Sequence, residues 1–321
     1  MEKAALPTIE IKQLLEESYP QITREMITNI EKNNGNEKNS HNYIVKTEKR
    51  KYLVRRHIIL TKENAEIVLG VISFCSKQGI KVPHVIENCR NGLVTERNDD
   101  YFTIFEFIEG SEFSGSEGQI RAVAREVARL HQVLRTYTGA LPKLENSAYD
   151  ENSYADLTEK EMESVSKELP AEDILFIKTE MEELNKRRIT NTDSITIQPI
   201  HRDLHPKNVL FHGDEVAAIL DFDAIKRGAR IVDVGFCGFR FAGKNILRFI
   251  EGYNTINHLT TEEKEVVLFA VREEFLRRIN YILHDLLKGQ KTWFSSLNSH
   301  LESIKTLQEI EISRQNGHPQ H

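Results

Sequence analysis

The chain has 321 residues, of which 39% are apolar and 29% are charged, and its formal net charge is −6. This length suits two lobes better than a single compact core. The absence of a dense basic tract argues against a nucleic-acid-binding protein, and no apolar run approaches the roughly 20 residues that span a bilayer. No signal-peptide core follows Met1, so we expect a cytoplasmic protein with no nucleic-acid or membrane partner.

The three cysteines, Cys75, Cys89 and Cys237, lie far apart in the sequence. Their spacing fits neither a metal site nor a disulfide framework. We therefore expect buried free thiols in a reducing compartment.

The first 110 residues have the pattern of strands arranged around one helix. Short β-like runs alternate with turn residues, and the helical stretch has an apolar face that ends at Gly79. Together these elements predict a small α+β lobe. The expected elements are, in chain order, a short amphipathic helix at 8–20, a polar loop at 31–42, strands at 43–45 and 52–59, a helix at 61–77 and a strand at 102–108.

Beyond Gly110 the pattern becomes mostly helical. Ser116 and Gln119 stand at capping-box spacing before one apolar repeat, and Thr260 and Glu263 open a longer one. Residues 141–190 are acidic with a weak apolar stripe. This segment is either an inserted element on the substrate side or a solvated helical face.

Two segments past the middle of the chain have the residues that phosphoryl transfer needs. The first, 201–208, reads His-Arg-Asp-Leu-His-Pro-Lys-Asn, and the second, 219–223, reads Ile-Leu-Asp-Phe-Asp. Asp203 is placed to align a hydroxyl group, and Asn208 and Asp221 supply the hard oxygen ligands that a magnesium ion prefers. The run 209–220 predicts a hairpin with its turn at 212–215, which would bring Asn208 and Asp221 to neighbouring ends.

Three other polar residues near these segments have structural interpretations. His201 is expected to brace the loop by a hydrogen bond rather than to donate a proton. Asp233 lies between apolar residues, so its carboxylate is expected to accept backbone hydrogen bonds from the catalytic loop. His131 follows the apolar side of its helix and is expected to be a core histidine.

Several features of protein kinases are missing from the chain. Gly35 is the only glycine before Gly70, so no glycine-rich phosphate loop is present. No proline occurs between Pro206 and Pro319, which excludes the Ala-Pro-Glu anchor, and Asp223 stands where Asp-Phe-Gly has glycine. The sequence thus favours a small-molecule kinase.

At these residues the chain resembles the aminoglycoside phosphotransferase superfamily, which includes choline kinases and the second type of homoserine kinase. The resemblance extends from about Tyr43 to Tyr281 and is most specific in the catalytic half. The matching pieces are 200–210, 219–223, Gly228, Arg230 and 233–235, with 107–110 and 130–131 in support.

The resemblance implies an α+β, two-lobed, protein-kinase-like fold. A small β-rich N-terminal lobe would comprise residues 1–108, and a larger, mostly helical C-terminal lobe residues 109–321, with ATP in the cleft. By the same resemblance Asp203 is the catalytic base, and Asn208 and Asp221 are the Mg²⁺ ligands.

The resemblance also implies nucleotide-binding residues in the first lobe. The hinge whose backbone meets adenine falls at Glu106, Phe107 and Ile108. The strand cation falls at Arg55, with Arg56 as the alternative, and arginine can pair with phosphate through two hydrogen bonds. Its helical partner is Glu66, or Glu63 one turn earlier. A solvated helix face is the competing interpretation of both glutamates.

The expected activity is ATP-dependent phosphorylation of a hydroxyl group on a small molecule, such as an amino sugar, an amino alcohol, a homoserine-like metabolite or an aminoglycoside. Glu273, Glu274 and Asp285 could bind an amine, or they could face water. A protein serine/threonine kinase and a non-catalytic nucleotide-binding regulator are the alternatives. The sequence indicates neither the acceptor, nor a choice between ATP and GTP, nor the oligomeric state.

Overall fold

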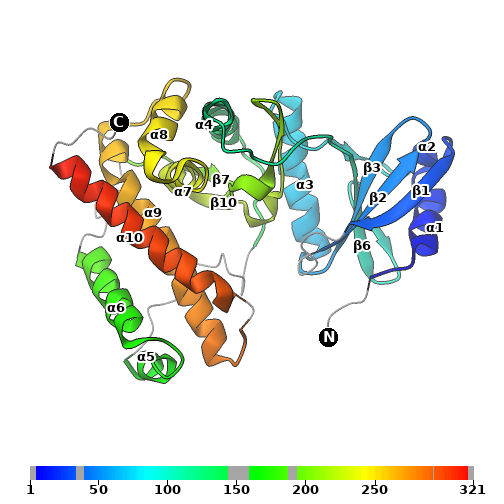
Figure 1. The fold of residues 1–321 in the computed structure, drawn as a ribbon. Helices are drawn as coiled ribbons and strands as arrows, with labels where there is room; N and C mark the ends of the chain where they lie inside the picture. Colours follow the sequence, from blue (N-terminus) through cyan, green and yellow to red (C-terminus); the bar gives the residue numbers. More distant parts are fainter. Residues whose placement is uncertain (1–4, 34–39, 144–158, 187–193, 292, 317–321) are drawn as a thin grey trace. The chain divides into compact units, whose positions relative to one another are not determined.

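The computed structural model describes residues 5–33, 40–143, 159–186, 194–291 and 293–316 (Figure 1). The chain divides into two compact units. Unit 1 is Met1–Lys143 with Pro206–Lys226, and unit 2 is Leu144–His205 with Arg227–His321. The chain thus changes unit within the predicted catalytic segment, directly after His205. The lobe boundary predicted at residue 108 stays a prediction.

An antiparallel sheet forms one part of unit 1 (Figure 1), and the described residues give it six strands. Along β2 buried and half-buried residues alternate, as expected of a strand with one face on a core. The spatial order is β1-β2-β3-β6-β4, with β5 paired to β6. The strands are β1 (Ile27–Asn33), β2 (Ser40–Thr47), β3 (Lys51–His57), β4 (Val85–Ile86), β5 (Thr95–Arg97) and β6 (Asp100–Glu106).

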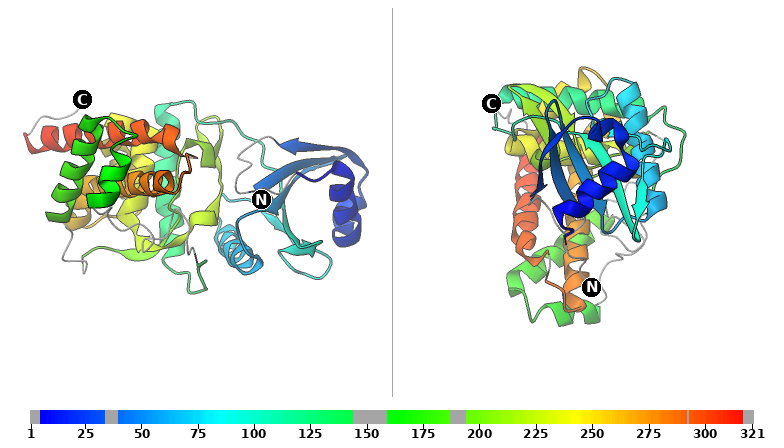
Figure 2. Two further views of the ribbon diagram at one scale, coloured as in Figure 1. Left: turned by 90° about the horizontal axis from the view of Figure 1, so that it is seen from below. Right: turned by 90° about the vertical axis from the view of Figure 1, so that its right-hand side faces the viewer.

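Two short helices, α1 (Thr8–Ser18) and α2 (Pro20–Thr23), cover one face of this sheet (Figure 2). Leu14 of α1 and Tyr19, which lies between the two helices, pack with Tyr43 of β2 in one apolar cluster. Full burial of side chains of this size stabilises the fold by roughly 1.5–3 kcal/mol each. The N-terminal helices therefore belong to the core of unit 1.

Two longer helices and a hairpin complete unit 1. The hydroxyl of Thr61 accepts a hydrogen bond from the Asn64 N–H and so caps the first of these helices. The second packs against a strand of the hairpin. The elements are α3 (Lys62–Lys77), α4 (Glu117–Leu134), the single-turn helix η1 (Pro206–Asn208), β8 (Val209–His212), β9 (Glu215–Ile219) and the single-turn helix η2 (Phe222–Ala224).

Unit 2 is mostly helical, with one two-stranded sheet formed by β7 (Ile197–Ile200) and β10 (Lys226–Ala229). The long α9 packs against α5, α6, α7 and α10 and is the centre of this unit. The helices are α5 (Glu159–Val165), α6 (Ala171–Lys186), α7 (Arg230–Ala242), α8 (Ile246–Asn254), α9 (Thr261–Leu287) and α10 (Leu297–Gln315), with single turns η3 (Gly243–Asn245) and η4 (Phe294–Ser296).

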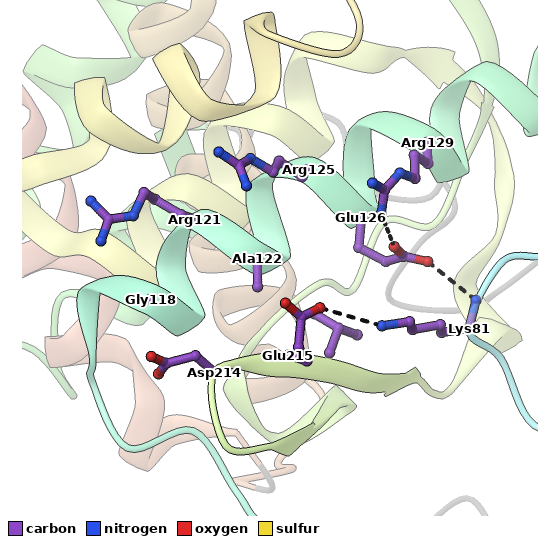
Figure 3. A pocket seen from close by; sticks show the side chains of 10 residues that line it. Lys81, Gly118, Arg121, Ala122, Arg125, Glu126, Arg129, Asp214 and Glu215 are labelled. Carbon is purple, nitrogen blue, oxygen red and sulfur yellow. Dashed lines mark hydrogen bonds and ion pairs between the residues drawn. The ribbon is translucent and has the colours of Figure 1, made fainter.

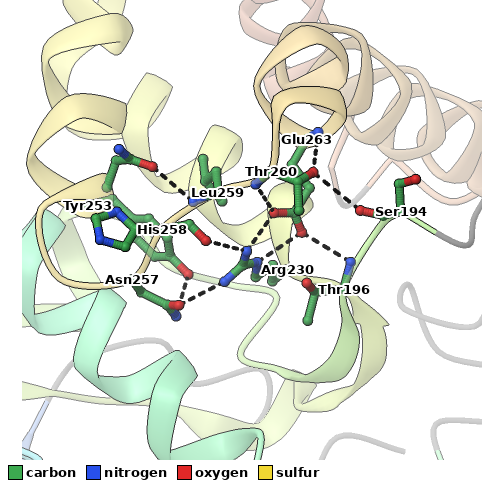
Figure 4. A network of polar contacts seen from close by, with 10 residues as sticks. Ser194, Thr196, Arg230, Tyr253, Asn257, His258, Leu259, Thr260 and Glu263 are labelled. Atoms are coloured by element: carbon green, nitrogen blue, oxygen red, sulfur yellow. Dashed lines mark hydrogen bonds and ion pairs between the residues drawn. The ribbon is translucent and has the colours of Figure 1, made fainter.

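A polar network at Arg230 joins β7, α7 and the start of α9 (Figure 4). The guanidinium donates to Glu263 (2.9 Å), to the Asn257 amide oxygen (2.8 Å) and to the His258 carbonyl (2.7 Å). Glu263 also accepts the N–H of Thr260 in a capping box, at the helix start that the sequence predicted. Because Arg230 and Glu263 are buried and their donors and acceptors are matched, the pair fixes this junction.

The structure corrects two expectations. The polar loop predicted at 31–42 is in part strand: β1 extends to Asn33 and β2 begins at Ser40, while residues 34–39 lie outside the described residues. Along β1 all residues are exposed or half-buried, so the strand carries little hydrophobic signal. Of the three cysteines expected to be buried, Cys89 is exposed.

Residues 144–158 and 187–190 of the acidic segment lie outside the described residues. The described helix α6 does not only face water, because Ile177 and Glu180 are buried where it packs against α9. His131 is fully buried, as predicted. Across the described ranges, no helix combines the length and apolarity that a membrane crossing requires.

Candidate active site

The loop after β7 carries the predicted catalytic aspartate, and Asp233 in the first turn of α7 organises it. One carboxylate oxygen of Asp233 accepts the N–H of His201 at 2.7 Å, and the other accepts the N–H of Arg202 at 2.8 Å. Both backbone donors are buried and would be costly to leave unpaired. This confirms the predicted structural role of Asp233.

The same loop contains a strained residue, Arg202, whose φ is 74°. A left-handed conformation at a residue other than glycine, asparagine or aspartate costs on the order of 1–3 kcal/mol and needs support from its surroundings. The Arg202 guanidinium is buried and donates to Glu274 at 2.9 Å. The Nδ1 atom of His201 accepts the Asp203 N–H at 3.3 Å, which is the bracing role predicted for this histidine.

Asp203 lies at the end of this braced loop with its side chain 17% exposed. An Arg278 nitrogen is 3.6 Å from one carboxylate oxygen, and Nε2 of His205 is 3.5 Å from the other. Burial alone would raise the pKa of Asp203, but the His205 hydrogen bond and the Arg278 charge outweigh it and lower the pKa to about 2. The carboxylate is therefore ionised at neutral pH.

Arg278, on α9, is held in place on several sides. Its Nε donates to Glu274 at 3.1 Å and another nitrogen donates to the Arg202 carbonyl at 3.2 Å. The guanidinium carbon lies 4.3 Å from the centre of the Phe236 ring, in cation–π geometry. Arg278 therefore ties α9 to the catalytic loop and limits the positions that the Asp203 side chain can take.

Glu274 does not serve the roles expected from sequence, which were to bind an amine or to face water. Its side chain is 3% exposed and lies against Arg202 and Arg278. Burial would raise the pKa of Glu274, but the charges of Arg202 and Arg278 outweigh burial and lower it. The Glu274 carboxylate is thus paired with arginines of the protein and is not available to bind an amine.

The predicted metal ligands Asn208 and Asp221 lie in unit 1, at the open end of the hairpin β8–β9. The Leu220 N–H donates to the Asn208 carbonyl at 2.8 Å, which places Asp221 beside the turn that contains Asn208. Asp221 itself has a φ of 62°, a left-handed conformation that aspartate tolerates better than most residues. The structure therefore brings these two residues together, as the hairpin pattern predicted. That Asp203 joins them stays a prediction.

Arg55 on β3 lies against this end of the hairpin. One of its guanidinium nitrogens is 3.6 Å from Asp221 and 3.4 Å from Asp223. Burial would lower the pKa of Arg55, but the two carboxylates outweigh burial and raise it. Arg56 instead pairs with Asp100 at 2.7 Å, with both side chains buried. Of the two candidates for the strand cation, Arg55 is thus the one beside the predicted metal ligands.

Glu66 is exposed on α3, and so is Glu63. Within the described ranges neither forms an ion pair with Arg55, whose partners are Asp221 and Asp223. Helix α3 does pack against η2, the turn that follows Asp221. The pairing of Arg55 with a glutamate on α3 stays a prediction.

The donor set of Asn208 and Asp221 fits a magnesium ion. The two residues offer one amide and one carboxylate oxygen, and Mg²⁺ in phosphotransferases takes one or two carboxylates and completes its shell with phosphate oxygens and water. No cluster of three or more His, Cys, Asp or Glu suited to a metal occurs among the described residues.

The predicted hinge follows β6 in unit 1. The N–H of Glu106 donates to the His84 carbonyl at 2.9 Å, and the N–H of Phe107 donates to the Lys51 carbonyl at 3.0 Å. The described residues provide no hydrogen-bond partner for the Ile108 N–H. Ile108 thus has a backbone donor that an adenine ring could use, whereas the two preceding donors are already paired.

A surface hollow of about 260 Å³ lies at the turn end of the hairpin (Figure 3). Arginines on α4 face Asp214 and Glu215 across it, and Lys81 pairs with Glu215 at 3.6 Å. At about 3.3 Å per residue, the strand β8 separates this hollow from Asn208 by roughly 13 Å. The residues that line the hollow carry both positive and negative charges, so they favour neither an anionic nor a cationic ligand. For this reason, and because of its distance from Asn208, the hollow is not part of the candidate active site.

The sequence prediction missed Arg278. Its spacing four residues after Glu274 is ordinary on a charged helix, and such helices commonly face water. Glu273 and Glu274 are each followed by an arginine at this spacing, Arg277 and Arg278, so the charge pattern of the helix did not single out Arg278. Only the packing of α9 against the loop shows which of these charges are used there.

Comparison with known proteins gives one family and one fold. The model of a family described as "Phosphotransferase enzyme family" matches residues 29–266. A homoserine kinase of Janthinobacterium sp. is 25% identical over 56% of this chain, and the match spans about half (54%) of that relative. A homoserine kinase of Beijerinckia indica is 24% identical, with 74% of each chain covered.

Solved structures with low sequence identity share the fold. An aminoglycoside phosphotransferase from Alicyclobacillus acidocaldarius has a TM-score of 0.67 at 13% identity, with 98% of this chain and 97% of that chain covered. A microcompartment-associated aminopropanol kinase has a TM-score of 0.66 at 15% identity, with 97% and 99% covered. The amicoumacin kinase bound to AMP-PNP and Ca²⁺ has a TM-score of 0.63 at 16% identity, with 95% and 96% covered.

Proposed function

Because this chain belongs to the phosphotransferase enzyme family, we propose that it is a small-molecule kinase that transfers the terminal phosphoryl group of ATP to a hydroxyl group. The observation that carries the proposal is the braced loop at Asp203. Its backbone is fixed by Asp233, and its carboxylate is kept ionised by His205 and Arg278. A loop that only connected β7 to η1 would need neither the hydrogen bonds to Asp233 nor an ionised carboxylate.

In the proposed reaction the acceptor oxygen forms a bond to the terminal phosphorus while the bond from that phosphorus to the bridging oxygen breaks, so ADP leaves. The hydroxyl proton passes to Asp203 and then to water. With a pKa of about 2, Asp203 is a weak base. Its main contribution is therefore to align the hydroxyl, and the proton moves once bonding to phosphorus has made it acidic.

Asn208 and Asp221 would hold the magnesium ion, which offsets charge on the phosphates when bound. Arg55 already faces Asp221 and Asp223, so it would exchange part of this pairing for contact with phosphate oxygens. At the hinge, Glu106 and Phe107 would shape the adenine site. The N–H of Ile108 would supply its hydrogen bond.

The acceptor is a small molecule with a free hydroxyl group. The name of the matched relatives makes homoserine one acceptor to test, and the fold neighbours add amino alcohols and aminoglycosides. We place the reaction in the cytoplasm, where ATP and magnesium are available. The chain between Asp223 and Asp233 is taken up by η2, β10 and the start of α7, which disfavours a peptide-docking segment and hence a protein substrate.

The test is magnesium-dependent ADP release from ATP with a panel of hydroxyl compounds, with the phosphorylated product identified by phosphorus NMR. Asp203→Asn keeps the size of the side chain but removes its charge. We expect its turnover to fall about 10²- to 10⁴-fold with ATP binding almost unchanged. Glu48→Gln, a change on an exposed residue of unit 1, is the matched control and should behave like the wild type.

Near-normal turnover by Asp203→Asn would exclude Asp203 as the aligning residue. Phosphorylation of a casein-like protein mixture, without turnover of any small molecule, would favour a protein kinase. ATP binding without turnover of any acceptor in the panel would favour the non-catalytic regulator.

A further inference from the structure

Cations gather around Asp203 in unit 2. Arg278 is 3.6 Å from the Asp203 carboxylate and stacks on Phe236 of α7. Arg240 lies four residues after Phe236 in the same helix, and residues at this spacing share a helix face. Arg240 is exposed, so its guanidinium is open to a ligand.

The neighbouring arginines already have acidic partners. Arg202 pairs with Glu274 at 2.9 Å, and Arg277 pairs with Glu273 at 3.3 Å. Arg278 is matched by Asp203 and by Glu274. Arg240 differs from them, because it forms no hydrogen bond and no ion pair with any residue that the structure describes.

The position of Arg240 is electrostatically unfavourable without a ligand. Although the Arg240 residue is exposed, neighbouring protein atoms desolvate its charge and lower its pKa, the charge of Arg278 lowers the pKa further, and the Asp203 carboxylate offsets only part of this. Arg240 therefore lies close enough to Arg278 to be repelled by it. An anion bound at this place would relieve the repulsion, whereas a cation would increase it.

His300, on α10, adds a neutral polar group to the same neighbourhood. Its ring packs 5.6 Å from the ring of Phe275. Burial and the charges of Arg278 and Arg240 lower the pKa of His300 to about 4, so the ring is uncharged at neutral pH. Its Nδ1 atom is buried and has no hydrogen-bond partner among the described residues. Such an orphaned group is costly unless a ligand or water satisfies it.

We propose that the acceptor carries a carboxylate in addition to its hydroxyl group, and that Arg240, next to Arg278, binds this carboxylate while the hydroxyl group faces Asp203. This inference rests on the proposed kinase function. A single unmatched arginine suits a group with one negative charge, which favours a carboxylate over a phosphate ester. Arginine also matches the planar, two-oxygen geometry of a carboxylate.

The proposal separates the acceptor classes that the sequence left open. Hydroxy acids and hydroxy amino acids have the required carboxylate. Choline and aminoglycosides have cationic groups and no anion, so the arginines beside Asp203 would repel them. Glu274, the buried carboxylate that might have offset this repulsion, is already paired with arginines.

The experiment compares acceptors that differ only in the carboxylate. The probes are homoserine against homoserine amide, and γ-hydroxybutyrate against butanediol, with choline, an aminoglycoside and a sugar phosphate as further arms. Turnover is followed by ADP release, and binding is measured by calorimetry in the presence of ADP and magnesium. We expect at least one of the acids to be preferred over its uncharged partner.

Arg240→Met removes the charge but keeps an apolar stem, and Arg240→Lys keeps the charge. For the acids we expect Arg240→Met to raise KM and Kd about tenfold to hundredfold, the effect of losing a hydrogen-bonded charge pair. The KM for ATP should not change, the KM for the acids should rise more than the KM for the uncharged acceptors, and Arg240→Lys should restore part of the affinity. Arg125→Met is the matched control, because Arg125 is an exposed arginine of α4 without an ion pair among the described residues.

Two results would overturn the inference. Equal discrimination between acid and amide in wild type and Arg240→Met would exclude Arg240 as the carboxylate-binding residue. Turnover of choline, aminoglycosides or sugar phosphates with no turnover or binding of the acids would refute the carboxylate while leaving the kinase function intact. Conversely, Arg240-dependent binding of the acids without any ATP turnover would uphold the carboxylate site and refute the proposed activity.

Discussion

Arginines of unit 2 occur in two settings with different charge balance. Arg272, in the middle of α9, donates from each of its three guanidinium nitrogens: to Glu180 of α6 at 2.8 Å, to Glu183 at 3.0 Å and to Glu311 of α10 at 2.6 Å. One turn and a half further along the same helix, Arg278 lies beside Asp203, near the unmatched Arg240.

The difference separates a stabilising network from a site prepared for a ligand. At Arg272 three acidic groups surround one cation, and at Arg230 one acidic group, an amide oxygen and a carbonyl do so, which gives each guanidinium nitrogen a partner within the protein. Around Asp203 there are more arginines than acidic residues that can pair with them, so one arginine remains to interact with a ligand. Substitutions in the first setting should affect unfolding, and substitutions in the second should affect catalysis.

The largest effect on stability is expected from Arg272→Met. The change leaves Glu180 buried without its cation, and breaking a buried pair in this way costs about 3–5 kcal/mol. The free energy of unfolding, measured in urea, should fall by that amount, while the activity of the folded fraction stays near the wild-type value. Lys244→Met is the control, because its ion pair with Glu309 is exposed and worth at most about 1 kcal/mol.

The double variant Arg272→Met with Glu180→Met should recover much of the lost stability, since an apolar pair of similar volume avoids the uncompensated charge. A loss of less than about 1 kcal/mol in Arg272→Met would show that the network does not hold α6 against α9.

Next comes Arg278→Met, for which we expect a catalytic effect. Without this cation the Asp203 side chain is less confined, and turnover should fall about tenfold to hundredfold. The pKa of Asp203 should rise from about 2, because one of the groups that lower it is gone. As pH falls, the variant should therefore lose its ionised carboxylate at a higher pH than the wild type does.

The measurement is kcat against pH at saturating substrates. The wild type should show no acid limb from Asp203 between pH 8 and pH 5, and the acid limb of Arg278→Met should lie at higher pH than that of the wild type. A uniform loss of rate with an unshifted profile would indicate that Arg278 acts through the fold alone.

The smallest effect is expected from Thr260→Ala at the start of α9. The change removes the hydroxyl that accepts the Glu263 N–H, a helix cap typically worth about 1 kcal/mol. Thermal unfolding should shift slightly to lower temperature with kcat unchanged. Thr255→Ala, which removes an exposed hydroxyl at the end of α8, should leave both quantities unaltered. A clear fall in kcat for Thr260→Ala would show that the Arg230 junction also serves catalysis.

The catalytic loop was the most predictable part of this chain. The spacing of Asp203, Asn208 and Asp221 and the apolar runs around them predicted the hairpin, and Asp233 was predicted to support the loop. Local patterns suffice there because each partner lies within a few dozen residues and each role restricts the residue type. The predicted family and the α+β, protein-kinase-like fold are confirmed by the family match and by the fold neighbours.

Other features could not be predicted from local patterns. Strand β1 has few apolar residues because it lies at the edge of the sheet, so its pairing with β2 leaves no periodic signal. Glu274 is an ordinary surface residue by sequence, and its burial follows only from the approach of α9 to the loop.

The sequence by itself thus indicated the proposed reaction class, because Asp203, Asn208 and Asp221 at this spacing are the residue types that align a hydroxyl group and bind magnesium in phosphoryl transfer. The tertiary structure decided which charges are matched and which are available. That property depends on distances between helices far apart in sequence, as between Arg272 and Glu180 or between Arg278 and Asp203. The charge pattern along one helix does not show which charges are paired. The same arginine stabilises the fold when acidic residues pack against it and can bind a ligand when they do not.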